Sequence, residues 1–115
     1  PGGMPGAETL SNTPALVEWL QRHAEADGGI AAICAAPALV FSKLQLPRRL
    51  RLTCYPGYES LLQPRHEVIA AAVVPDGNFI TARGPGSAAK FGMEILAKIR
   101  GRESAMAVSS DMIIE

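Results

Sequence analysis

The chain has 115 residues, 48% of them hydrophobic, which fits one globular domain and excludes a disordered chain. Eleven basic residues balance eleven acidic ones, and no apolar run approaches the roughly 20 residues of a membrane span, so neither nucleic acid nor a membrane is an expected partner. Its two cysteines, without a histidine cluster, fit neither a disulfide framework nor a zinc site. We therefore expect a cytoplasmic protein with no metal and no other cofactor.

The first half of the chain predicts a helix, a strand and a second helix. Thr13 and Pro14 are typical of a helix start, and apolar residues then recur at helical spacing. Residues 30–33, Ile-Ala-Ala-Ile, form the uninterrupted apolar run expected of a central parallel strand covered on both faces. Residues 35–37, Ala-Ala-Pro, then lead into an apolar helix through residues 38–44, with Pro37 in its first turn. Cys34 is therefore expected between strand and helix.

Further strands are predicted in the second half. The alternation over residues 49–52 indicates a strand with one solvent-facing side, and residues 58–62 indicate a helical turn. A β-branched and alanine-rich run over residues 68–74 is followed by turn residues at 75–78 and a second apolar run at 79–82. We expect these two runs to form a hairpin or two adjacent strands.

The last part of the chain predicts two helices. Ser87 is a typical cap, and Phe91, Ile95 and Ile99 have the spacing of a buried helical stripe that ends at Gly101. A second short helix is expected from Glu103. Because helices and strands alternate throughout, the predicted fold class is α/β with a mainly parallel sheet. Ligands of such sheets bind beyond the carboxyl ends of the strands, where Cys34 is expected.

Cys34 is the residue to which the sequence assigns chemistry. Unpaired amides and the positive end of a helix stabilise a thiolate, which makes such a cysteine nucleophilic and oxidisable. The order strand, nucleophile, helix is also that of the strained elbow of α/β hydrolases, and Ala35 and Ala36 are small enough for a tight turn. A buried cysteine that acts as a small hydrophobe is an equally weighted alternative from position alone. Gly2 and Gly3 can present amides to the same edge, although a plain turn is the commoner role of such a pair.

The other polar candidates are interpreted as structural. Cys54 has the position of a resolving thiol, but a half-buried cysteine at a strand end is more often part of the core. His23 and His66 are not visibly paired with Cys34, and Asp76 is expected in a turn. Arg83, beside Gly-Pro-Gly, has the chemistry to bind an anion, although pairing with a carboxylate is favoured.

Residues 30–37, IAAICAAP, closely resemble the nucleophile elbow of the ThiJ/PfpI superfamily, in particular its Parkinsonism-associated DJ-1-like branch. Residues 1–3 (PGG), 10–11 (LS), 83–86 (RGPG) and 91–92 (FG) also resemble that branch at compatible spacing. The resemblance therefore covers essentially the whole chain.

This resemblance implies a flavodoxin-like sandwich that is usually a homodimer. It implies that Cys34 is an easily oxidised nucleophile and that the backbone amides of Gly3 and Ala35 face the oxyanion of a small aldehyde substrate. Tyr55 and Arg83 are then candidate neighbours of the site. Relatives are associated with a metal-free glyoxalase activity, a disputed protein deglycase activity, redox sensing through a sulfinate, and a chaperone-like role.

The chain departs from that branch in two places. Relatives hold a buried glutamate against the cysteine from an early helix, and residues 1–115 contain no counterpart. We therefore expect these residues to be the C-terminal major portion of one domain, whose first strands and helix come from a separate or missing N-terminal segment. Second, Tyr55 precedes Pro56 where many relatives have histidine, which weakens a histidine-assisted glyoxalase mechanism. Ala35 after the cysteine disfavours the protease branch, and the lack of a downstream His-x-Glu pair disfavours an amidotransferase.

Two functions remain open from the sequence. In the first, Cys34 attacks reactive aldehydes or their protein adducts as a cysteine-dependent oxidative and carbonyl-stress enzyme. In the second, Cys34 is a redox sensor or chaperone-like binding site that changes partner binding when it is oxidised, without turnover.

Overall fold

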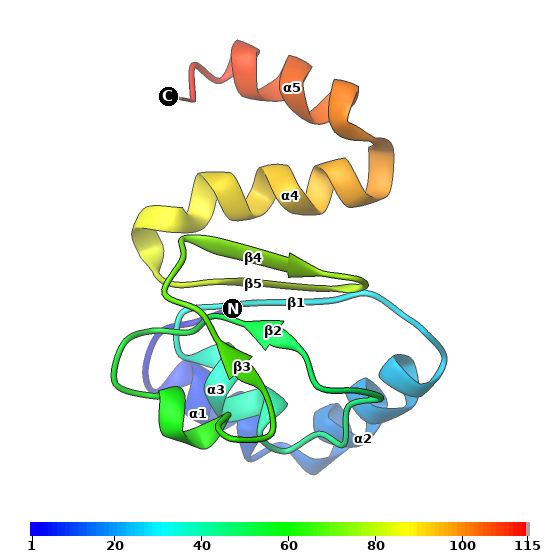
Figure 1. Ribbon diagram of the computed structural model, residues 1–115, viewed down its shortest axis with the longest axis vertical. Helices are drawn as coiled ribbons and strands as arrows, with labels where there is room; N and C mark the ends of the chain where they lie inside the picture. Colours follow the sequence, from blue (N-terminus) through cyan, green and yellow to red (C-terminus); the bar gives the residue numbers. More distant parts are fainter. Residues whose placement is uncertain (115) are drawn as a thin grey trace.

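Three strands form the central sheet of the chain. The computed structural model, which describes residues 1–114, places β1 (Ile30–Ile33) beside β5 (Phe79–Ala82) and β5 beside β4 (Val73–Asp76) (Figure 1). β1 and β5 are parallel, whereas β4 and β5 are antiparallel. β2 (Arg51–Leu52) and β3 (Glu67–Val68) form a separate parallel pair. The α/β class is confirmed, and the sheets mix parallel and antiparallel pairs.

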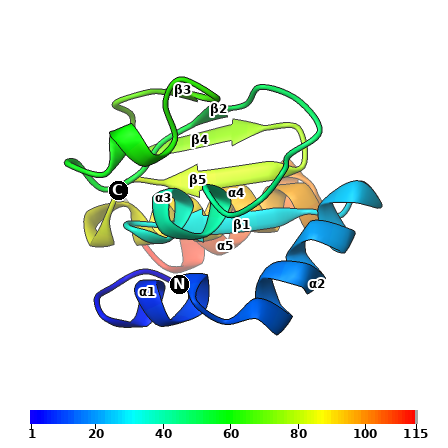
Figure 2. The same ribbon diagram turned by 90° about the horizontal axis from the view of Figure 1, so that it is seen from below.

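Helices cover both faces of the central sheet. Three of them, and the β2–β3 pair, lie on one side, whereas the last two helices lie on the other (Figures 1 and 2). On the first side are α1 (Gly6–Ser11), α2 (Pro14–Glu25) and α3 (Ala36–Phe41), and on the second are α4 (Ala88–Arg100) and α5 (Arg102–Asp111). Short 3-10 turns at η1 (Glu59–Leu61) and η2 (Pro85–Ser87) complete the elements. None of the helices within residues 1–114 combines the length and the apolarity that crossing a membrane requires.

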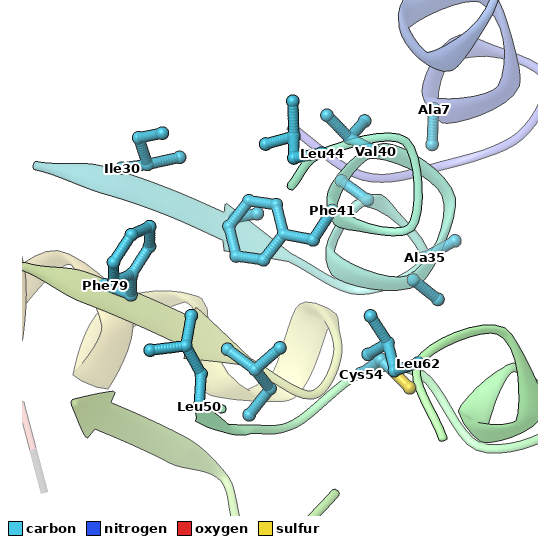
Figure 3. Close-up of a cluster of buried hydrophobic side chains, with 14 of the residues drawn as sticks. Ala7, Ile30, Ala35, Val40, Phe41, Leu44, Leu50, Cys54, Leu62 and Phe79 are labelled. Carbon is cyan, nitrogen blue, oxygen red and sulfur yellow. The ribbon is translucent and has the colours of Figure 1, made fainter. Parts of the chain in front are cut away.

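The core lies between α3 and the strands. Phe41 and Phe79 pack edge to face with ring centroids 6.2 Å apart, which is a favourable aromatic geometry (Figure 3). Leucines from the loop after α3, from β2 and from the end of η1 are fully buried around them: Leu44, Leu50, Leu52 and Leu62. The alternation predicted over residues 49–52 is confirmed, because the two leucines are buried and the two arginines are exposed.

Two predictions about burial were wrong. Residues 30–33 form the expected strand, but β1 lies at the end of the strand order and Ala31 is exposed, so it is not central within the described residues. The predicted stripe on α4 is only partly buried, and Ile99 is 69% exposed. Ala31 belongs to β1, and Ile99 lines the same hollow as Ala31 at the edge of β1 that has no neighbouring strand within residues 1–114, which explains why both are exposed.

The hairpin prediction is confirmed for residues 73–82, but the predicted run over residues 68–74 is divided between β3 and β4, and the turn is tighter than expected. The turn consists of Gly77 and Asn78 alone, with Gly77 at a positive φ of 60°, so Asp76 is the last residue of β4 and not a turn residue. Its carboxylate accepts hydrogen bonds from the guanidinium of Arg48 at 2.9 and 3.0 Å and from the amide of Arg51 at 2.8 Å. This charge-assisted contact fixes the loop before β2 to the hairpin.

Candidate active site around Cys34

Cys34 occupies the turn between β1 and α3 in a strained backbone conformation. Its φ is +68°, in the left-handed region that non-glycine residues rarely adopt, which confirms the dihedral expected of a nucleophile elbow. Two backbone hydrogen bonds hold the strained residue in place. The Cys34 amide donates to the Ala82 carbonyl at 2.9 Å, and the Cys34 carbonyl accepts from the Tyr55 amide at 2.8 Å. The side chain is half-buried.

Gly2 lies directly against the cysteine. A Cβ atom at this position would lie 2.5 Å from the Cys34 Cβ, 2.7 Å from the Ile33 carbonyl oxygen and 3.4 Å from the Cys34 sulfur. Only a residue without a side chain permits this approach of backbone to thiol. The sequence pointed to the Gly-Gly pair but gave the amide role to Gly3; it did not identify Gly2 as the residue in contact.

Gly3 and Ala35 were predicted to supply oxyanion amides, and both lie in the segments that flank the thiol. Gly3 has a φ of +85°, and its carbonyl accepts from the Ala7 amide at 2.8 Å, which joins the Gly-Gly turn to α1. Ala35 is buried and precedes the first turn of α3, where backbone amides lack helical partners. Because α3 has only six residues, these free amides matter more than a long aligned dipole. That both amides face one oxyanion stays a prediction.

Tyr55 and Arg83 come to the same edge of the fold by different routes. Ile33 and Ala82 are register partners in the parallel β1–β5 pair, so Cys34 and Arg83 each follow the carboxyl end of a strand. Tyr55 reaches the turn through the hydrogen bond from its backbone amide to the Cys34 carbonyl, and the residue is 45% exposed. A Cβ at Gly84 would lie 3.6 Å from that ring, so Tyr55 lies over the backbone that follows Arg83.

Cys54 has the environment of an unreactive thiol. It is 2% exposed and belongs to the core cluster with Ala35 and Leu62 (Figure 3). Burial raises the pKa of the Cys54 thiol to about 11; the carboxylate of Glu59 adds to the rise, and the guanidinium of Arg83 opposes it. A thiol with this pKa is protonated at neutral pH, so it is a poor nucleophile.

The two histidines lie in separate parts of the structure. His23 stacks on Trp19 at a centroid distance of 4.7 Å, and its Nε2 is 3.1 Å from the Gly29 carbonyl. His66 is buried, and its Nδ1 accepts the amide of Leu50 at 3.0 Å. Among residues 1–114, no three His, Cys, Asp or Glu side chains are grouped to hold a metal ion.

The arrangement therefore joins a strained, half-exposed thiol to a Gly-Gly backbone turn, a helix start and an aromatic side chain. A thiol in this setting can add to a carbonyl carbon or react with an oxidant, because the neighbouring backbone supplies amides and not bulky side chains.

Comparison with known proteins gives a consistent match. Residues 1–98 match the DJ-1/PfpI family. The chain is 38% identical over 114 residues to Protein DJ-1 homolog B of Arabidopsis thaliana, covering 99% of this chain and 26% of the relative. It is 31% identical over 104 residues to the glutathione-independent glyoxalase DJR-1.2 of Caenorhabditis elegans, covering 90% of this chain and 54% of the relative.

The crystal structure of Drosophila melanogaster DJ-1beta superposes with a TM-score of 0.92 at 32% identity, covering 100% of this chain and 62% of that one. The chain thus spans from about a quarter to about three fifths of the length of these relatives, and it corresponds to a C-terminal portion of them.

Proposed function

Because the chain belongs to the DJ-1/PfpI family and has its flavodoxin-like fold, we propose that Cys34 is the nucleophile of a cysteine-dependent protein that acts on reactive aldehydes or their protein adducts. The observation that carries the proposal is the backbone of Cys34, with its φ of +68° and with Gly2 in contact. Strain of this kind persists only where surrounding structure enforces it, and it clusters at functional sites. The glyoxalase name of the C. elegans relative supports the aldehyde as substrate class.

The proposed reaction begins with addition of the Cys34 thiolate to the aldehyde carbon of an α-oxoaldehyde. The electron pair of the C=O bond moves to the oxygen, and a proton gives the hemithioacetal. Transfer of a proton from this carbon to the neighbouring carbonyl carbon, together with transfer of the hydroxyl proton to the former carbonyl oxygen, then produces a thioester of a 2-hydroxy acid. Water cleaves the thioester, which releases the acid and restores the thiol. The sum is one aldehyde and one water to one 2-hydroxy acid, without an external oxidant.

The chain's own residues have limited roles in this scheme. The amides of Gly3 and Ala35 are proposed to stabilise the oxyanion, and Tyr55 forms an exposed aromatic wall beside the turn. The proton transfer between carbons needs a general base. We propose that a glutamate of the N-terminal portion of the domain supplies it, as the family resemblance implies.

Consumption of methylglyoxal tests the proposal. The assay uses the chain alone and, in parallel, a preparation that also contains the N-terminal portion of the family domain. Cys34→Ser should lower the rate at least about a hundredfold, because a serine hydroxyl is a much weaker nucleophile at neutral pH. Cys54→Ala, checked for folding by circular dichroism, is the matched control and should retain the rate. Wild-type preparations without turnover would remove the enzyme hypothesis.

Redox sensing is the alternative function, and the half-exposed thiol of Cys34 favours it over a purely structural role. The thiolate attacks one oxygen of hydrogen peroxide, forming a sulfenate and releasing water, and a second peroxide gives the sulfinate. In this alternative, partner binding changes with oxidation, and wild type and Cys34→Ser consume methylglyoxal equally slowly.

A further inference from the structure

Two tyrosines form an aromatic pair beside the thiol turn. The rings of Tyr55 and Tyr58 have centroids 6.5 Å apart and planes inclined at 67°, which is the favourable edge-to-face geometry. Tyr58 is half-buried and packs against the core cluster, whereas Tyr55 is 45% exposed. The reaction proposed above uses a thiol, backbone amides and a base, and none of its steps requires an aromatic ring. The exposed ring of Tyr55 is therefore available to contact the rest of the substrate.

Three hydrogen bonds hold Tyr55 in place. Its amide donates to the Cys34 carbonyl at 2.8 Å, and its carbonyl accepts the amide of Tyr58 at 3.3 Å. The second bond closes a four-residue turn with proline in second place and Gly57 in third, at a φ of +101°, as type II turns require. The amide of Gly57 donates to the carboxylate of Glu59. A ring carried by such a fixed turn loses little freedom when a ligand packs on it.

The side chain of Tyr55 extends from the thiol turn to the end of β5. Its backbone is bonded to Cys34, and a Cβ at Gly84 would lie 3.6 and 3.8 Å from Cδ2 and Cε2 of its ring. Because Gly84 has no side chain, it leaves that edge of the ring uncovered. Ligands of α/β sheets bind over the carboxyl ends of the strands. A molecule attached to the Cys34 sulfur therefore has this ring as a neighbour.

We propose, on the basis of the function proposed above, that Tyr55 is a specificity-determining residue and that the substrates are α-oxoaldehydes with an aromatic group on the ketone carbon. In the hemithioacetal, sulfur is bonded to the aldehyde carbon, and the ketone carbon with its substituent is the next atom along. An aromatic substituent can pack on the Tyr55 ring edge to face or offset, whereas a methyl group offers much less apolar surface. The balance is unchanged: phenylglyoxal and water give mandelate, as methylglyoxal and water give lactate.

The charges beside the ring favour a neutral substituent over an ionic one. Hydrogen bonds from the backbone amides of Glu59 and Gly57 lower the pKa of the Glu59 carboxyl, and the nearby guanidinium of Arg83 contributes to this shift. The carboxylate and the guanidinium have opposite charges, so the pair has no net charge with which to select an anionic or a cationic group.

Steady-state kinetics with phenylglyoxal and methylglyoxal test the proposal, using the chain alone and the preparation that also contains the N-terminal portion. Formation of mandelate or lactate is measured, because phenylglyoxal also reacts with arginine side chains and its loss would overstate turnover. The ratio of the two kcat/KM values, phenylglyoxal over methylglyoxal, should fall about fivefold or more in Tyr55→Leu, as expected for the loss of one aromatic contact. Comparing ratios cancels the difference in intrinsic reactivity between the aldehydes.

Two further variants separate the ring from other effects. Tyr55→Phe keeps the ring and loses the hydroxyl, so it should keep the wild-type ratio. Trp19→Leu removes another aromatic side chain, 53% exposed on α2, and should also keep the ratio. If Tyr55→Phe lowers the ratio as much as Tyr55→Leu, the hydroxyl and not the aromatic surface determines specificity, and the proposal is overturned.

Binding of the two products gives a readout that does not depend on turnover. Mandelate and lactate differ in the same way as the two aldehydes, and NMR titration of the backbone amides measures their affinities. Mandelate should shift the amide of Gly84 and bind about fivefold more tightly than lactate, and this preference should fall in Tyr55→Leu.

The outcomes distinguish failure of this inference from failure of the proposed function. Turnover with the same ratio in wild type and Tyr55→Leu would overturn the specificity and leave the thiol chemistry intact. Lack of turnover with both aldehydes would remove the enzyme hypothesis, and the titrations would then decide the role of Tyr55. Mandelate that binds no more tightly than lactate, or with the same preference in Tyr55→Leu, would overturn the inference.

Discussion

The amide of Tyr55 donates a hydrogen bond of 2.8 Å to the carbonyl oxygen of Cys34, twenty-one positions earlier in the chain. This contact is the last of an alternating series in which every second amide of one segment bonds to the central sheet or its end. In this series the amide of Arg51 donates to the Asp76 carboxylate, the amide of Thr53 to the Thr81 hydroxyl, and the amide of Tyr55 to the Cys34 carbonyl. Two of the three acceptors are side chains, so the position of Tyr55 beside the thiol depends on residues remote from it.

Thr81→Val should destabilise the fold by about 1–3 kcal/mol, because it leaves the buried amide of Thr53 without an acceptor. The Thr81 side chain is fully buried, and valine has nearly the same shape, so the lost acceptor dominates. Urea denaturation measures the free energy of unfolding, and hydrogen exchange should show faster exchange at Thr53. Thr81→Ser keeps the hydroxyl and should keep the Thr53 amide protected; equal exchange rates at Thr53 in the two variants would contradict the prediction.

Gly2→Ala should also destabilise the fold by about 1–3 kcal/mol, as expected for an added methyl group that its surroundings cannot accommodate. The added Cβ would meet the Cβ of Cys34 and the carbonyl of Ile33, which belong to a strained turn with little freedom to shift. Gly6→Ala is the matched control, because a Cβ there meets nothing within 4 Å and Gly6 lies in α1, where alanine is favoured by up to about 1 kcal/mol. If both variants unfold at the same urea concentration, Gly2 has no packing role.

The elbow was predictable from sequence because its signals are local. An apolar strand run, a cysteine, two alanines and a proline stand in consecutive positions, and the positive φ of Cys34 follows from the turn they form. The family pattern strengthened that prediction. The exposure of Ala31 depends on whether another strand lies beside β1, and the residues of β1 do not contain that information; it agrees instead with the expectation that the first strands come from a separate or missing segment.

Other parts of the fold depend on contacts between distant positions. Asp76 was expected in a turn, but its carboxylate accepts hydrogen bonds from the Arg48 guanidinium and the Arg51 amide, which are 28 and 25 positions away in the chain. The hydrogen bond from the Leu50 amide to Nδ1 of His66 likewise could not be predicted from the sequence, although the structural role predicted for His66 is confirmed. Local sequence patterns predict the helices and strands and their order. They do not identify which polar side chain accepts a backbone amide in place of a neighbouring strand.

His66→Asn should remove a fall in stability that the wild type shows below about pH 6.5. Burial lowers the pKa of His66, and the positive charges of Arg65 and Arg49 add to this effect. Below the ordinary histidine pKa of about 6.5, the unfolded chain therefore binds a proton that the folded chain does not, so stability decreases as pH falls. The slope from this group cannot exceed about 1.4 kcal/mol per pH unit, the limit for one proton.

Urea denaturation from pH 8 to pH 5 measures this effect. The asparagine carbonyl can accept the Leu50 amide in place of Nδ1, so His66→Asn should be near wild type in stability at pH 8 and flatter below pH 6.5. His23→Asn, the control at the other histidine, should keep the fall. A fall of equal slope in wild type and His66→Asn would show that the buried imidazole is not its source.

Cys34 should be oxidised by peroxide faster than Cys54, at least tenfold in initial rate. Peroxide reacts with the thiolate and must reach the sulfur. Cys54 meets neither condition, because it is 2% exposed and its thiol pKa is raised to about 11, mainly by burial. Cys34 is half-exposed, and Gly2 beside it presents backbone and no side chain to the approaching oxidant.

Limited peroxide treatment followed by tryptic peptide mass spectrometry measures the two rates in one sample, because cleavage at Arg22, Lys43, Arg51 and Arg65 places the cysteines in different peptides. Oxygen should be added first to the peptide of residues 23–43, with two oxygens as the sulfinate forms. In Cys34→Ser, the peptide of residues 52–65 should remain unmodified over the same time. The comparison should be repeated with the N-terminal portion present, because an ionised carboxylate near Cys34 would slow the reaction and a protonated one would favour the thiolate. Equal oxidation of the two peptides in both preparations, or faster oxidation of Cys54, would show that the turn at Cys34 is not built for thiol chemistry.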